Sequence, residues 1–233
     1  MAGLKPFCYA RRVDDTLRTF VQNLAVWALP VLVAIIFHEL AHGVVAYWRG
    51  DDTALRAGRL TLNPLAHIDP IGSIAIPVFL LIAQAPFLFG YAKPVPVNFG
   101  QLRNPKRDMV LVAAAGPLMN VLLAILSAAA LKTILAVAPH HAALGVSSDM
   151  LKPLAMMAAR SVGMNVVLAV FNMLPIPPLD GGRVLVGLLP RAQAIAVARL
   201  ERYGMMIVFM LLATHTLGSV INPVINMFLR VLL

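Results

Sequence analysis

The chain has 233 residues, of which 60% are hydrophobic and only 12% are charged, and its mean hydropathy is +0.84. A typical soluble domain carries about 25% charged residues, so this composition excludes a water-soluble fold and predicts an all-α polytopic membrane protein. The net charge of +9 suits an anionic lipid bilayer rather than nucleic acid, and the single cysteine, Cys8, excludes an intrachain disulfide or a cysteine-based zinc site.

Long apolar runs predict where the chain crosses the membrane. In chain order they are Phe20–Tyr47, Ile71–Phe89, Met109–Ala138, Leu154–Leu174, Met205–Leu217 and Val224–Leu233. Every segment between them is short, so we expect a single domain over residues 1–233. Within it we expect an amphipathic segment at 1–19 lying on the membrane surface, a core at about 20–190 and a C-terminal span at 203–233.

Two polar segments are expected to be extended rather than helical. Gly58–Pro70 has alternating leucines followed by an Asn-Pro turn, which predicts a short β-strand or hairpin. Lys93–Asn98 contains two prolines that forbid a helix. The apolar run Ile71–Phe89 is itself broken by Pro77 and Pro86, which fits a re-entrant hairpin better than a complete crossing.

The first span ends in the sequence FHELAH, which is typical of a zinc site. His38 and His42 are four residues apart, so on a helix they share a face, with Cβ atoms about 5–6 Å apart, and both imidazoles can reach one metal ion. Glu39 lies beside the pair and can accept a proton from water at the metal. The alternative is two core histidines bonded to main-chain carbonyls, but it leaves a carboxylate inside an apolar run unexplained.

A catalytic zinc site needs a third protein ligand and one open position. Asp180 is the preferred candidate, because it follows a proline-rich break after the fourth span, and a broken helix at membrane depth is tolerated only where it is buried or lines a wet cavity. His67 and Asp69 remain alternatives, and a helix–helix hydrogen bond better explains His215. Solvation explains the remaining acidic residues and histidines: Asp14, Asp15, Asp51, Asp52, Asp108, His140, His141, Asp149 and Glu201.

Five segments of the chain together resemble the site-2 protease family of intramembrane zinc metalloproteases. They are, in order, HELAH at the end of the first span, GRLTLNPLAHIDPIG, GYAKPVPVNF, AAAGPLMN and FNMLPIPPLDGGR. The resemblance covers about Phe37 to Pro190, and the pairing of HExxH with NxxPxxPLDGG is its most specific part.

The resemblance implies a three-span catalytic core that holds one Zn²⁺ per chain, with the ligands His38, His42 and Asp180. It implies that Glu39 is the general base, that Asn172 helps to hold substrate near the metal and that Asn120 lines the same cleft. Interhelical hydrogen bonding is the alternative for both asparagines. The implied reaction is hydrolysis of a peptide bond within or near the transmembrane helix of a single-span membrane protein. The family often carries PDZ or CBS modules, for which this chain has no room, so it resembles a minimal member.

The distribution of positive charge predicts which side the metal faces. The polar segments expected on its side (49–60, 93–108 and 180–202) hold 11 Lys and Arg residues, whereas those on the other side hold 7. The positive-inside rule then places the metal nearer the cytoplasm of a multi-pass protein in a cell membrane, most simply a prokaryotic plasma membrane, although the basic N-terminus opposes this orientation.

Two other functions remain open from the sequence. A metal transporter should distribute acidic residues or histidines along a path, whereas here they cluster at one place. A catalytically inactive membrane chaperone with the same fold should lack the base or a metal ligand, whereas Glu39 is present.

Overall fold

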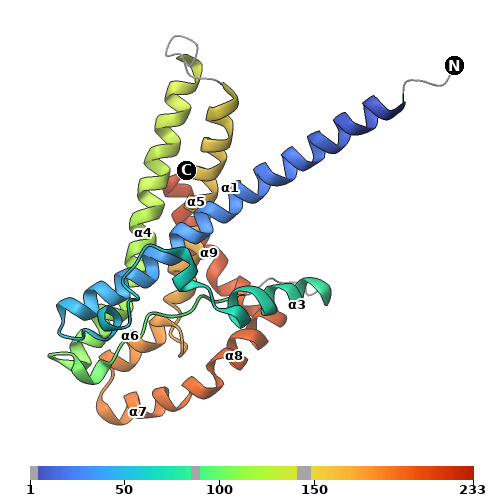
Figure 1. Ribbon diagram of the computed structural model, residues 1–233. Helices are drawn as coiled ribbons and strands as arrows, with labels where there is room; N and C mark the ends of the chain where they lie inside the picture. The colour runs from blue at the N-terminus through green and yellow to red at the C-terminus, as the bar shows by residue number, and fades with distance from the viewer. Residues whose placement is uncertain (1–4, 85–89, 141–147) are drawn as a thin grey trace.

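The computed structural model describes residues 5–84, 90–140 and 148–233, with side chains described from Val26 onwards (Figure 1). Within these residues every regular element is helical, which confirms the all-α prediction. The elements are α1 (Lys5–Trp48), α2 (Thr53–Arg56), η1 (Pro64–His67), η2 (Pro70–Ala75), α3 (Ile76–Ile82), η3 (Phe99–Gln101), α4 (Pro105–Val137), η4 (Ala138–His140), α5 (Ser148–Asn172), α6 (Asp180–Leu188), α7 (Arg191–Arg199), α8 (Glu201–Ala213) and α9 (Thr216–Leu232).

Three of the described helices are long and apolar enough to cross a membrane. They comprise Val26–Trp48 of α1, Pro105–His140 and Met150–Asn172. The helices α8 and α9 meet the same test only as a pair, and the pair is bent by 82°. The residue at the bend is His215, whose φ of 57° is in the left-handed region, so the helix cannot continue through it. The residues expected to form one C-terminal span at 203–233 are therefore two helices with a sharp bend between them, the geometry of either a broken span or a re-entrant loop.

The expected β-strand or hairpin over Gly58–Pro70 is wrong, because this segment forms no strand. Its prolines begin helical turns instead: the Asn63 side chain caps η1, and the Asp69 side chain accepts hydrogen bonds at the start of η2. Isolated hydrogen bonds join this region to the chain after Tyr91, such as those from the Lys93 amide to the His67 carbonyl (2.9 Å) and from the Arg59 guanidinium to the Lys93 carbonyl (2.8 Å). Lys93–Asn98 forms no helix, as expected, and the backbone at Asn98 is extended.

Other predictions fall partly outside the described residues. The helix over Pro70–Ile82 is too short to cross a bilayer, but Pro86 lies in the segment 85–89, so the re-entrant hairpin stays a prediction. His141 also lies outside the described residues. Of the amphipathic segment at 1–19, only the backbone from residue 5 is described, and it is continuous with α1.

The core is built where α1, α4 and α5 pack on one another, with α4 and α5 running side by side and α1 crossing them (Figure 1). Small side chains at the crossings allow the backbones to approach, and Ala34, Ala113 and Ala124 are each no more than 2% exposed. This close approach brings the polar end of the first span against α4.

An ion pair fixes the end of α1 to the start of α4. The Arg49 guanidinium contacts the Asp108 carboxylate at 2.5 Å. Asp108 and Asp51 are both completely buried, so the expectation that solvation explains these two residues is wrong. Nearby, the buried carboxylate of Asp51 accepts a hydrogen bond from the Asn98 amide (2.7 Å), which anchors the extended segment Lys93–Asn98 beside α1. The extended segment is thereby held next to the FHELAH sequence.

Candidate metal centre

The two histidines of FHELAH project from one face of α1 toward α4. Their Nε2 atoms lie 3.0 Å apart, and the rings meet edge to face with centroids 4.7 Å apart. His38 Nδ1 lies 2.5 Å from the side-chain oxygen of Asn120, and His42 Nδ1 lies 2.7 Å from the main-chain carbonyl of Val112. Both Nδ1 atoms therefore face acceptors, and both Nε2 atoms point to a common place.

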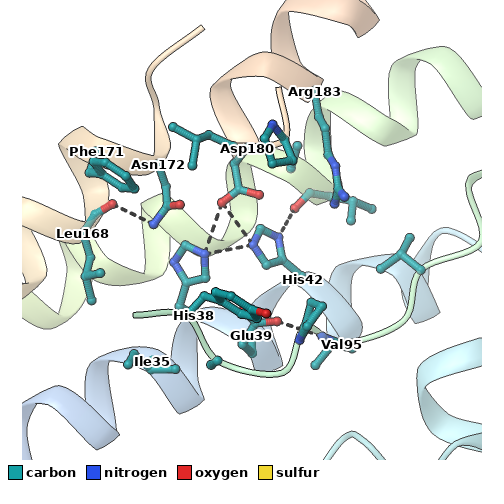
Figure 2. A pocket seen from close by; sticks show the side chains of 18 of the residues that line it. Ile35, His38, Glu39, His42, Val95, Leu168, Phe171, Asn172, Asp180 and Arg183 are labelled. Carbon is teal, nitrogen blue, oxygen red and sulfur yellow. Dashed lines mark hydrogen bonds and ion pairs between the residues drawn. The ribbon is translucent and has the colours of Figure 1, made fainter. Parts of the chain in front are cut away.

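Asp180 reaches that place from the first residue of α6. Its Oδ2 atom lies 3.1 Å from His38 Nε2 and 3.3 Å from His42 Nε2, and the residue is 8% exposed (Figure 2). The carboxylate thus completes a set of three side chains whose ligand atoms converge.

The break before α6 that carries Asp180 to this position depends on close backbone packing. A Cβ added to Gly181 would overlap the carbonyl oxygens of Met173 and Leu174, and one added to Gly182 would overlap the backbone at Ile176. Glycine therefore allows the chain to fold back on itself immediately after α5. The proline-rich sequence and the Gly-Gly pair together place a carboxylate beside two histidines that are more than 130 residues earlier in the chain.

The donor set fits a zinc ion. With hydrogens on both Nδ1 atoms, neutral imidazoles direct two Nε2 lone pairs at the Asp180 carboxylate, and Asp180 Oδ2 is buried without a hydrogen-bond partner. Three converging lone pairs call for a cation. Ligands at about 2.0–2.1 Å from a tetrahedral zinc lie about 3.3 Å apart, close to the separations of 3.0–3.3 Å here. Among the described residues, only these three form a group able to hold a metal ion.

Glu39 lines the same cavity without joining the three converging atoms. Its Oε2 atom accepts a hydrogen bond from the main-chain amide of Val95 (2.8 Å), which belongs to the extended segment (Figure 2). The cavity has a volume of about 450 Å³, and most of its lining is apolar. The polar side chains of the lining are the three converging ligands, Glu39, Asn172, Tyr91 and Arg183.

The two predicted asparagines occupy different positions. Asn172 lines the cavity, and its side-chain amide donates to the Leu168 carbonyl one turn earlier (3.0 Å). Asn120 is completely buried, is not part of the cavity lining and reaches the centre through its contact with His38. The structure therefore places Asn172 in the cavity wall and Asn120 behind the ring of His38.

The alternative ligands that the sequence left open lie elsewhere. The Nε2 atom of His67 faces the Thr61 carbonyl at 2.9 Å, Asp69 caps η2, and His215 is at the bend between α8 and α9. None of the three belongs to the group that could hold a metal among the described residues.

Sequence reasoning missed two groups at this site. A Cβ at Gly116 would meet the ring atoms of both histidines, so this glycine provides the space that the imidazoles occupy. Its position four residues before Asn120, on the same face of α4, is the signal that could have identified it. The Val95 amide left no such signal, because every non-proline residue has one.

The chain is similar in sequence to known proteins. The model of peptidase family M50 matches residues 137–215. The "Putative zinc metalloprotease YwhC" of Bacillus subtilis (strain 168) is 39% identical over 199 residues, covering 85% of this chain and 84% of that protein. "Putative zinc metalloprotease Rip2" is 32% identical in Mycolicibacterium smegmatis, covering 88% of this chain and 73% of that protein, and 31% identical in Mycobacterium tuberculosis (strain H37Rv), covering 86% and 70%. No solved structure matches the chain.

Proposed function

This chain belongs to peptidase family M50, the site-2 protease family, and from that premise we propose that it is an intramembrane endopeptidase that cuts within or near a transmembrane helix of another membrane protein. It is a zinc metalloprotease, and the apolar helices make it a multi-pass membrane protein. The observation that carries the proposal is the convergence of His38, His42 and Asp180 in a cavity that Glu39 and Asn172 also line.

The proposed ligands of the zinc ion are His38 Nε2, His42 Nε2 and Asp180 Oδ2. The ion supplies Lewis acidity, which makes a water molecule more acidic and polarises a carbonyl group. Glu39 accepts the proton of the attacking water and delivers it to the leaving amine. Asn172 lines the cavity and would hold the substrate carbonyl or donate to the developing oxyanion once its amide leaves the Leu168 carbonyl.

Substrate selection follows from the state of the backbone. A membrane helix satisfies each carbonyl internally, and opening a turn in hydrocarbon leaves donors and acceptors unpaired. We propose that substrates carry a weak helical turn and that the extended segment Lys93–Asn98 pairs with the freed backbone. Its location supports this, because Pro94, Val95 and Val97 line the cavity beside Glu39.

The register of α1 supports a site deep in the membrane. Trp27 near one end of the span and Arg49 at the other are residue types typical of the two membrane interfaces. The Arg160 guanidinium covers the Trp27 ring at 4.4 Å from its centroid. They are 22 residues apart, about 33 Å along a helix, close to the thickness of the hydrocarbon core. His38 is 11 residues from each. The excess of Lys and Arg on the Arg49 side leads us to propose that this side faces the cytoplasm.

A Glu39→Gln variant tests the proposal. It keeps the shape and polarity of the side chain but removes the base, so in liposomes we expect zinc and substrate binding to persist while proteolysis falls by several orders of magnitude. Cleavage at the wild-type rate would rule out Glu39 as the base. If the wild type itself binds substrate without cutting it, the chaperone alternative is correct, and zinc flux across the liposome membrane would indicate the transporter.

A further inference from the structure

A chain of buried hydrogen bonds leads from the metal centre into α5. The side-chain oxygen of Asn120 lies 2.5 Å from His38 Nδ1. The Asn120 amide nitrogen then donates to the side-chain oxygen of Asn165 (2.9 Å), and the Asn165 amide nitrogen donates to the Ser161 carbonyl (2.9 Å). Both asparagines are 0% exposed and neither lines the cavity, so they touch neither substrate nor metal.

Stability is a weak explanation for two buried amides here. Their surroundings are apolar, with Ala124, Val162 and Val166 packed in the same region between α4 and α5. Hydrogen bonds between membrane helices contribute on average only about 0.6 kcal/mol, and small apolar residues would pack at this interface equally well. The arrangement of donors and acceptors gives a stronger explanation.

Main-chain carbonyls fix the orientation of both amides. A carbonyl can only accept, so the nitrogen of Asn165 must face the Ser161 carbonyl, and its oxygen must face Asn120. The Asn120 nitrogen likewise faces two acceptors, the Asn165 oxygen and the Ala34 carbonyl (3.2 Å). The Asn120 oxygen is then forced toward His38.

This orientation determines which nitrogen of His38 carries hydrogen. An acceptor at Nδ1 requires the hydrogen there, which leaves the Nε2 lone pair directed at His42 and Asp180. A flipped Asn120 would offer a donor to Nδ1 and favour the opposite tautomer, which cannot bind a metal through Nε2. The metal-binding form of the histidine is therefore set from α5, more than 120 residues away in sequence.

We infer that Asn165 is a positioning residue of the metal centre, which holds the amide of Asn120 and through it the orientation and tautomer of His38. The inference rests on the proposed ligand set. A partner in direct contact with a ligand typically changes metal affinity by about 10–100-fold, and Asn165 acts one step further away. We expect a loss of about 3–10-fold in zinc affinity when its acceptor oxygen is removed.

The test is zinc affinity measured by chelator competition on the purified full-length chain in detergent. Asn165→Leu removes the acceptor at similar volume. Ser161→Ala is the control, because it removes only the Ser161 hydroxyl, which is 3.2 Å from the Asn165 nitrogen, and leaves the carbonyl. We expect weaker binding for Asn165→Leu and an affinity near wild type for Ser161→Ala. Equal losses for the two variants, or wild-type affinity for Asn165→Leu, would overturn the inference.

A double-mutant cycle tests whether Asn165 acts through Asn120. Asn165→Leu should add no further loss of zinc affinity to an Asn120→Ala background, whereas additive losses would mean that Asn165 acts only on packing and would refute the inference. His38→Ala serves as the reference for the site itself. If that variant binds zinc as tightly as the wild type, the ligand assignment fails; if only the asparagine variants behave normally, the ligands stand and the positioning role fails.

Discussion

Replacing Gly116 with alanine should separate the stability of the fold from its capacity to bind zinc. The added Cβ would lie 2.6 Å from His38 Cε1 and Nε2, and closer still to His42 Nε2. Ordinary contact begins near 3.4 Å, so the His38 ring must move away by about 0.8 Å and the His42 ring by about 1.0 Å. Metal–ligand distances tolerate only about 0.2 Å, so zinc affinity should fall by about a hundredfold or more, roughly 3 kcal/mol.

The same substitution should not unfold the protein. Alanine is favoured over glycine inside a helix by about 1 kcal/mol, so the thermal unfolding temperature of the metal-free protein should stay the same or rise. Gly163→Ala in α5 is the matched control, because a Cβ there meets nothing within 4 Å. It should gain the same helix preference and keep full zinc affinity.

Chelator competition and thermal unfolding on both variants in one detergent provide the assay. Wild-type zinc affinity in Gly116→Ala would refute the reasoning, because it would mean that the ring positions described above do not matter to the metal. An equal loss in Gly163→Ala would refute it as well, since the effect would then arise from any alanine in these helices.

Three further predictions concern the ligand, the base and the substrate. Asp180→Ala should lose bound zinc in elemental analysis, and full occupancy would reject Asp180 as the third ligand. Val95→Pro removes the main-chain N–H that donates to Glu39, so peptide cleavage should slow about tenfold at unchanged zinc content, which is the scale of a charge-assisted hydrogen bond. Val95→Ala keeps the N–H and should cleave at the wild-type rate. Equal cleavage rates for the two variants would show that this contact is dispensable. In a model single-span substrate, replacing Gly or Pro near the cut by Leu should slow product formation in reconstituted membranes, and equal rates would exclude selection by local unwinding.

The metal centre was predictable because its signals are local. Two patterns, each only a few residues long, predict the local geometry. They are the spacing of His38 and His42 on a helix and the Pro- and Gly-rich break before Asp180. The helices α4 and α5 were predictable for the same reason, since a long apolar run has few alternatives in a membrane.

The features that could not be predicted from the sequence depend on how the helices are rotated against one another and on main-chain groups. Asn120 and His38 are 82 residues apart, and whether the amide lines the cleft or lies behind the ring depends on how α4 is turned against α1. The hairpin prediction failed at Gly58–Pro70 because the alternation of leucines is short, and Asn63 and Asp69 cap helical turns that start at the following prolines.

Helix α8 packs closely against the chain before α6, and this packing has a further consequence. A Cβ at Gly204 would overlap the Pro177 carbonyl, so α8 lies directly on the turn that presents Asp180. Any movement of α8 must then displace this turn, and any ion that fixes Asp180 must restrain α8. Bound zinc should therefore slow amide hydrogen exchange in the C-terminal helices. By thermodynamic reciprocity, a molecule that binds those helices in the bilayer should change the affinity for zinc.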